Sequence, residues 1–78
     1  MTEHATHRLV NKLKVHRAML DLTQGELAAL VGVTRKSVNS IENGHFVPST
    51  ELALRMAHAL ECTVEGLFQL PQNPREEK

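Results

Sequence analysis

Two short helical segments joined by a glycine turn are the feature that most restricts how this chain of 78 residues can fold. The sequence TQGE, which starts at Thr23, has the form of a capping box and predicts a helix over 24–31. Gly32 supplies the left-handed backbone that a tight turn after a helix requires. Thr34 can then cap a second helix that ends just before Gly44. This spacing predicts a helix-turn-helix.

Three further helices are predicted around this pair. The first is expected over about 11–20, because leucines recur there at helical spacing. A fourth helix is expected to start at Ser49 or Thr50 and to stop near Glu61, and Thr63 can cap a last short helix. The pattern therefore favours an all-α fold of five helices.

Composition and the two ends of the chain set the limits of this domain. Two phenylalanines are the only aromatic residues, so the core must consist of Leu, Val, Ala and Met side chains. Residues 1–7 show no periodicity, and residues 71–78 combine two prolines with several charges, so both ends are expected to be flexible. One compact domain over residues 8–70 is predicted.

Apolar positions indicate how the two central helices pack. Five of them recur where the two helices must bury each other, and we expect all five in the core: Leu27, Val31, Val33, Val38 and Ile41. Beyond Gly44 the chain should be extended, since the residue before Pro48 is pushed out of the helical region. Phe46 and Val47 are expected to fold back onto the core.

The second helix of the motif has a polar face opposite its apolar side. At about 100° per residue this arc holds Lys36, Asn39, Ser40 and Asn43, with Arg35 at its margin. Arg35 and Lys36 lie in the first turn, where the helix dipole makes cations unfavourable by roughly 0.3 kcal/mol or more. Arginine and lysine can bind guanine, and asparagine can pair with adenine, in the major groove. Two cations at this position therefore favour contact with DNA, although surface charges on a helix used for protein contacts are an alternative.

The distribution of charge supports the same prediction. The formal net charge is zero, with nine basic and nine acidic residues. Six cations and two anions lie within residues 8–36, whereas three cations and five anions lie from residue 49 onward. Such an asymmetry can direct one face of a small domain toward phosphates.

The order and spacing of these residues resemble the Cro/CI-type (XRE-like) family of helix-turn-helix regulators. The resemblance covers about residues 9–70 and is carried by LTQGELAALVGVTRKSVNSIENG and by VPSTELALRMAHALECTVEGLF. It implies a lambda-repressor-like fold and a transcriptional regulator that binds double-stranded DNA, with helix 35–43 in the major groove. Members of the family often carry Gln-Gln where this chain has Arg35-Lys36, so no operator sequence can be transferred.

The resemblance also implies roles for individual residues. The DNA contacts implied by the resemblance are Gln24, Thr34, Arg35, Lys36, Ser40 and Asn43. Ser37 and Asn39, on the same helix, complete the predicted set of contact residues. Related repressors pair an arginine on the first helix with a glutamate at the end of the third, and the matching residues here are Arg17 and Glu42. The helical wheel independently places Glu42 beside the core, away from DNA.

The last apolar residues of the domain suggest how its ends are arranged. Short regulators of this kind pair the segment after the last helix with the residues before the first, which here implies a short two-stranded ribbon of 8–10 with 68–70. Leu67, Phe68 and Leu70 would also supply an apolar patch for a homodimer, whose two half-sites on DNA would lie about 34 Å apart.

Several classes of function have no support in the sequence. His4 and His7 invite a metal site, but no cysteine or carboxylate set completes it, and no cofactor is expected. No nucleophile stands with a base and there is no glycine-rich phosphate loop, so an enzyme is not expected. The single cysteine, Cys62, cannot form an internal disulfide, and no apolar run is long enough to span a bilayer. A cytoplasmic protein without membrane contact is predicted.

Together these features predict a sequence-specific DNA-binding transcriptional regulator. A homodimeric repressor or autoregulator that binds a double-stranded operator is the favoured form. The alternative is an antitoxin or protein-interaction module in which DNA binding is secondary.

Overall fold

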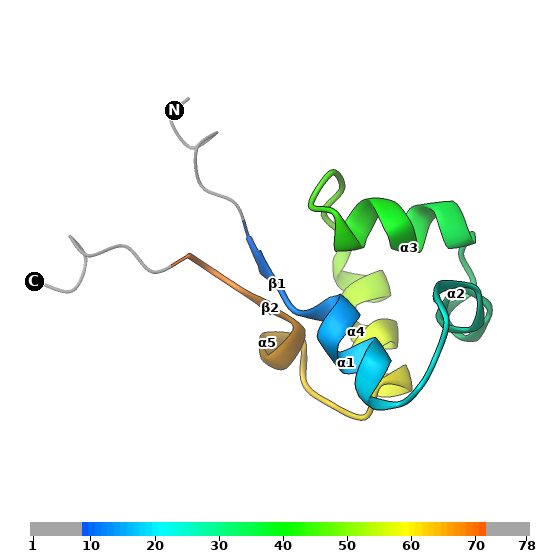
Figure 1. The fold of residues 1–78 in the computed structure, drawn as a ribbon. Coiled ribbons are helices and arrows are strands. Elements are labelled where there is room, and N and C mark those ends of the chain that lie inside the picture. The colour runs from blue at the N-terminus through cyan, green and yellow to red at the C-terminus, as the bar shows by residue number, and fades with distance from the viewer. Residues whose placement is uncertain (1–8, 72–78) are drawn as a thin grey trace, which may run out of the picture.

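The computed structural model describes residues 9–71, and the predicted all-α fold of five helices with a short ribbon is confirmed. The elements follow in the order β1 Val10–Asn11, α1 Leu13–Met19, α2 Gln24–Val31, α3 Arg35–Glu42, α4 Thr50–Ala59, α5 Val64–Leu67 and β2 Phe68–Gln69. Figure 1 shows α2 and α3 at the end of the molecule opposite the ribbon. The predicted tails, 1–7 and all of 71–78 except residue 71, lie outside the described residues.

The ribbon joins the start of the domain to its end. β1 and β2 are antiparallel, with Val10 opposite Gln69 and Asn11 opposite Phe68. Asn11 therefore belongs to a strand, and the prediction that the first helix begins near this residue is wrong. Pairing with Phe68 holds Asn11 in the ribbon, and its Oδ1 atom accepts a hydrogen bond from the backbone amide of Leu13 at 3.0 Å, which marks the start of α1.

Side-chain caps fix the starts of the other helices where the sequence predicted them. Thr23 and Glu26 form a reciprocal capping box at α2, with N···O distances of 3.0 and 2.8 Å. Ser49 caps α4 and Thr63 caps α5, each by accepting a backbone hydrogen bond from three residues further on. Gly32 ends α2 in the left-handed conformation with φ 81°, as the turn of the motif requires. Local chemistry therefore determines the boundaries of α2.

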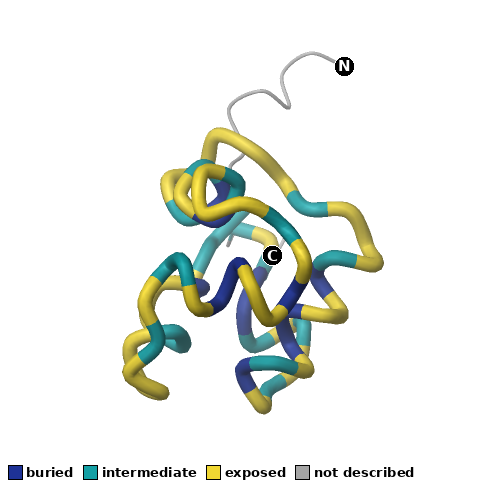
Figure 2. Tube along the Cα trace, turned by 90° about the vertical axis from the view of Figure 1, so that its right-hand side faces the viewer, coloured by how far each residue is buried: buried dark blue, intermediate teal, exposed yellow. Residues whose placement is uncertain are grey.

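The core lies between the helices and is built from aliphatic residues. Figure 2 shows the buried stretches of the chain gathered toward its interior, with exposed stretches on the outside. The largest fully buried side chains are Leu13, Leu27, Val38, Ile41, Met56 and Leu67. Val31 is buried as well, and Val33 is half-buried against the same cluster. The predicted packing of α2 on α3 is thus confirmed.

The connection from α3 to α4 does not return to the core. Phe46 is 50% exposed and Val47 is 65% exposed, so the prediction that both fold inward is wrong. Gly44 ends α3 with φ 77°, and the chain then follows the surface, where Val47 lines an apolar groove instead of the interior. Within residues 9–71, no helix combines the length and the apolar character that crossing a membrane would require.

Candidate nucleic-acid interface

The start of α3 combines a strong cap with unfavourable charges. The Thr34 hydroxyl accepts a hydrogen bond from the backbone amide of Ser37 at 3.1 Å and lies 3.1 Å from the Ser37 hydroxyl. Arg35 and Lys36 follow in the first turn, and both are exposed. Neither forms an ion pair within the described part of the chain. This helix start therefore carries two accessible cations at the positive end of the helix dipole.

Neighbouring helices show what is unusual about this arrangement. The first turns of α2, α4 and α5 carry Glu26, Glu51 and Glu65 respectively. Neither α1 nor α3 has an acidic residue in its first turn, and α3 places two adjacent cations there. An acid at this position stabilises a helix, typically by 0.3 to about 1 kcal/mol. The charge pattern of α3 thus departs from that of α2, α4 and α5 where the resemblance implies contact with DNA.

The two faces of α3 are sharply divided. Val38 and Ile41 are fully buried beneath it. The opposite face is polar and carries Arg35, Lys36, Asn39 and Asn43, all exposed, with Ser37 and Ser40 half-buried. The structure therefore brings these sequence-predicted contact residues together on one side of one helix, and Thr34 lies at the start of that helix.

An ion pair joins α1 to the end of α3. Arg17 Nε lies 2.7 Å from Glu42 Oε2, and Arg17 Nη2 lies 3.3 Å from Oε1, so the guanidinium binds the carboxylate through both oxygens. The third guanidinium nitrogen donates to the backbone oxygen of Leu22 at 2.7 Å. The side chain of Glu42 is 3% exposed and that of Arg17 is 14% exposed. The predicted pairing of these two residues is present and nearly removed from water.

Gln24, at the first position of α2, reaches across to this pair. Its Nε2 atom lies 3.0 Å from Glu42 Oε1 and 3.2 Å from Asn39 Oδ1. Asn43 Nδ2 also donates to Asn39 Oδ1, at 3.4 Å. The sequence did not predict this network, because its members are 15 and 18 residues apart on two helices whose relative rotation no local spacing specifies. The signal in the sequence that could have indicated the network was a side-chain amide at the start of α2, Gln24, together with a polar residue on α3, Asn39.

A hollow lies beside α3 and includes part of the loop that follows it, with Phe46, which was predicted to pack on the core. Its volume is about 370 Å³, and its lining residues are Thr34, Lys36, Ser37, Ser40, His45 and Phe46. The loop after α3 thus extends the exposed polar face with an imidazole and an aromatic ring. The exposed position of Phe46 could not be predicted from its apolar character.

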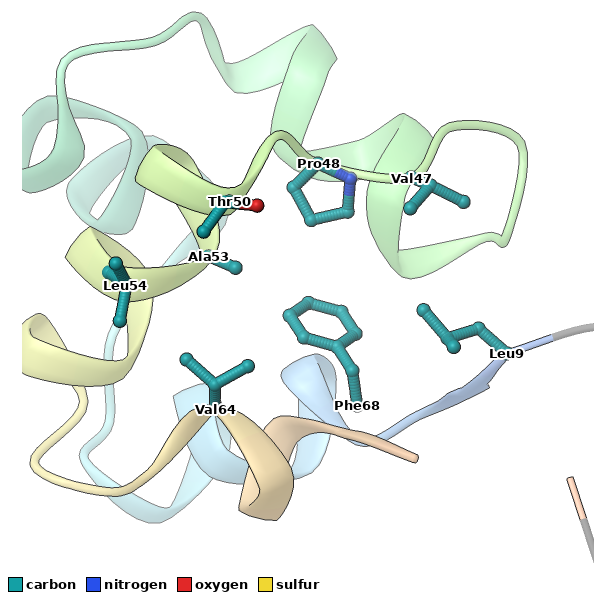
Figure 3. Close-up of a pocket in the computed structure, with 8 residues that line it drawn as sticks. All are labelled: Leu9, Val47, Pro48, Thr50, Ala53, Leu54, Val64 and Phe68. Atoms are coloured by element: carbon teal, nitrogen blue, oxygen red, sulfur yellow. The ribbon is translucent and has the colours of Figure 1, made fainter. Parts of the chain in front are cut away.

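The residues predicted for a dimer surface lie in different environments. Leu67 is fully buried inside its own chain, so it offers no surface to a partner, and the prediction is wrong at this position. Leu70 is 82% exposed. Phe68 is 9% exposed, and its ring forms part of an apolar groove of about 320 Å³. Figure 3 shows this groove, which is lined by Leu9, Val47, Pro48, Thr50, Ala53, Leu54, Val64 and Phe68.

Other reactive groups lie apart from this polar face. Burial raises the pKa of the Cys62 thiol, so at neutral pH it is held in the unreactive protonated form. No three metal-binding side chains gather within residues 9–71. His4 and His7, the pair considered for a metal, lie outside the described residues.

Comparison with known proteins agrees with this geometry. A family model described as helix-turn-helix matches residues 13–67. An uncharacterised HTH-type transcriptional regulator of Methanocaldococcus jannaschii is 41% identical over 58 residues, which cover 74% of this chain and 88% of that protein.

Solved structures resemble the fold as well. The restriction-modification controller protein C.AhdI from Aeromonas hydrophila has a TM-score of 0.66 at 31% identity, covering 69% of this chain and 82% of its own. The clp gene regulator ClgR from Corynebacterium glutamicum also has a TM-score of 0.66 at 31% identity, although the matched region is 69% of this chain and 57% of ClgR. With the helix-turn-helix geometry and the family match on the same residues, the chain belongs to the Cro/CI-type family of helix-turn-helix, DNA-binding transcriptional regulators.

Proposed function

We propose that this regulator is a homodimeric repressor or autoregulator that reads the major groove of double-stranded DNA with α3. The observation that carries the proposal is the exposed pair Arg35 and Lys36 in the first turn of α3, in place of the acid found at the starts of α2, α4 and α5. These cations weaken an isolated helix but favour its entry into a negatively charged groove.

The arrangement of side chains supports different roles for different residues of α3, with some contacting bases, some contacting phosphates and some capping the helix. Arg35 can form a bidentate contact with O6 and N7 of guanine, and Lys36 can reach the same edge or a phosphate. Ser40 lies one turn further on and can reach base edges or flanking phosphates, while Asn43 at the far end can hold a phosphate. Thr34 and Ser37 hydrogen-bond each other and form the cap, so their main contribution is to fix where the cations lie.

Gln24 is the proposed contact from α2. It stands at the first position of that helix, where the backbone amides favour a phosphate oxygen. Its side-chain amide nitrogen already donates to Glu42 and Asn39 and holds α2 and α3 in register, so the proposed phosphate contact is made by its backbone amide. Two helices fixed in this way can dock on DNA with little rearrangement.

The homodimer is proposed on the basis of exposed apolar surface. Leu54 is 57% exposed and Val47 is 65% exposed, and both line the apolar groove. Leu70 extends from the ribbon and is 82% exposed. Covering these side chains with a second copy would bury apolar area, and a two-fold dimer would match half-sites about 34 Å apart.

The test is selection of bound sequences from random double-stranded DNA by the full chain, followed by footprinting. We expect an enriched pseudo-palindrome whose half-sites are one helical turn apart, with binding that weakens steeply as salt increases. Absence of any enriched sequence would overturn the proposal. Stable capture of the product of a neighbouring gene, with only weak DNA binding, would instead favour an antitoxin or protein-interaction module.

A further inference from the structure

A chain of hydrogen bonds fixes the orientation of two amide groups, starting from a charge. Glu42 forms an ion pair with Arg17, at 2.7 Å, and the carboxylate of an ion pair can only accept hydrogen bonds. The Gln24 atom that lies 3.0 Å from Glu42 Oε1 must therefore be the nitrogen of its amide. This assignment follows from the charge of Glu42 and does not depend on seeing hydrogen atoms.

The same reasoning passes to Asn39. The Gln24 nitrogen also lies 3.2 Å from the Asn39 amide, and a donor requires an acceptor opposite, so the Asn39 atom facing it is Oδ1. Asn43 Nδ2 donates to this oxygen from the other side, at 3.4 Å. The Asn39 oxygen thus receives two donors. Its Nδ2 group has no hydrogen-bond partner within residues 9–71, and the residue is exposed on α3.

We infer that Asn39 is presented to DNA as a hydrogen-bond donor and selects guanine over adenine. The usual pairing of asparagine with adenine needs the amide oxygen to accept from N6 while the nitrogen donates to N7. Here Gln24 and Asn43 occupy that oxygen. Guanine offers two neighbouring acceptors, O6 and N7, which match an amide that has only donors to give. The inference rests on the proposed function, because it requires α3 to enter the major groove.

The hydrogen-bond network therefore lets nearly buried residues determine which base Asn39 prefers. Arg17 orients Glu42, Glu42 orients Gln24, and Gln24 orients Asn39, although the first two residues are nearly buried. Gln24 acts here as a positioning residue. Removing its amide leaves Asn39 Oδ1 with only the longer contact from Asn43, at 3.4 Å, so Asn39 can rotate and form the pairing with adenine.

Selection from random DNA tests the inference when the unaltered chain is compared with three variants. Asn39→Ala identifies the base pair that Asn39 reads, because the preference at that position flattens. At this position we expect the unaltered chain to prefer G·C over A·T by about tenfold. Gln24→Met, which keeps the length of the side chain, should reduce this preference to within about twofold. Gln69→Met is the matched control, since its amide donates to the backbone oxygen of Glu65 on α5. It should leave the preference unchanged.

Two results of the selection would overturn the inference while leaving the proposed function intact. One is a preference for A·T at the position that Asn39→Ala flattens. The other is a normal enriched operator in which Asn39→Ala changes no position. If no sequence is enriched by the unaltered chain, it is the proposed function that fails.

A measurement without DNA tests the orientation of the amides by itself. In nuclear magnetic resonance spectra of the free protein, we expect the side-chain amide protons of Gln24 to exchange slowly with water and those of Asn39 to exchange rapidly. In Gln24→Met, the Asn39 protons should still exchange rapidly, but their resonances should shift. In Gln69→Met, the Asn39 resonances should stay where they are in the unaltered chain. Protected Asn39 protons in the unaltered chain would contradict the proposed orientation, whatever the result with DNA.

Discussion

Arg17 Nε lies 2.7 Å from Glu42 Oε2, and this ion pair joins α1 to the last turn of α3. The Glu42 side chain is 3% exposed, so removing it leaves a guanidinium partly buried without its counter-charge. Breaking such a pair strongly lowers the free energy of unfolding, because the remaining charge is too buried for water to replace its lost partner. We predict that Glu42→Ala lowers the free energy of unfolding by about 3 kcal/mol, measured by urea denaturation.

An exposed ion pair in the same protein provides the control. Arg55 Nη2 lies 2.6 Å from Glu51 Oε2, but the two side chains are 54% and 73% exposed. Glu51→Ala should therefore lower the free energy of unfolding by less than about 1 kcal/mol. Equal effects of Glu42→Ala and Glu51→Ala would mean that burial of the first pair does not matter. The double change Arg17→Met with Glu42→Leu should recover much of the loss.

Arg35 offers the most direct test of base recognition. If it binds guanine in bidentate fashion, Arg35→Ala should weaken binding to the selected operator by about 1 to 3 kcal/mol and relax the preference at one position. Stability should be unchanged or slightly higher, because a cation leaves the positive end of the α3 dipole. Binding is measured by titration of labelled operator and of random DNA at one salt concentration.

The matched control for Arg35→Ala is Lys14→Ala, which removes an exposed cation from α1. The change in operator affinity should be no larger than the change expected from losing one positive charge far from the contact surface. If Arg35→Ala weakens binding to operator and to random DNA equally, Arg35 contributes charge and does not read a base.

Leu54 tests where a second copy would bind. It is 57% exposed and lines the apolar groove, so Leu54→Asp should place a charge in the proposed dimer contact and favour the monomer. Sedimentation equilibrium should show a dimer for the unaltered chain and a monomer for this variant. Val15→Asp, at a residue 56% exposed on α1, is the control and should remain dimeric. A Leu54→Asp variant that remained dimeric would show that the groove is not the interface.

Much of the fold could be predicted because the signals are local. Thr23, Thr34, Ser49 and Thr63 cap helices through backbone amides three residues away, and the geometry of such caps depends on little else. The buried positions of α2 and α3 follow from helical spacing. The Arg17–Glu42 pair was also available, through the wheel position of Glu42 and the resemblance to a family.

What the sequence did not reveal depends on contacts between distant parts of the chain. The first helix starts two residues later than expected because Asn11 pairs with Phe68 in the ribbon. Phe46 is apolar yet exposed, since the loop follows the surface once Gly44 has ended α3. The Gln24–Asn39 contact requires the rotation of two helices about each other, which only the packed core determines.

Two helices end in non-glycine residues with a strained backbone, which the sequence did not predict. Asp21 and Glu61 both adopt the left-handed conformation with φ 58°, at the position that Gly44 occupies after α3. Cys62 N donates to Ala57 O at 2.9 Å across the second of these turns, so the strained geometry closes α4. An L-residue in this conformation costs roughly 1 kcal/mol, and glycine avoids that cost.

Glu61→Gly should therefore stabilise the protein. We expect the free energy of unfolding to rise by roughly 0.5 to 1 kcal/mol, because relief of the strain exceeds the added flexibility of the unfolded chain. The melting temperature should increase by about 4 °C, measured by circular dichroism. Glu65→Gly makes the same chemical change inside α5, where the backbone is helical, and it should lower stability by up to about 1 kcal/mol. If both variants were less stable than the unaltered chain, strain at residue 61 would not limit the stability of this fold.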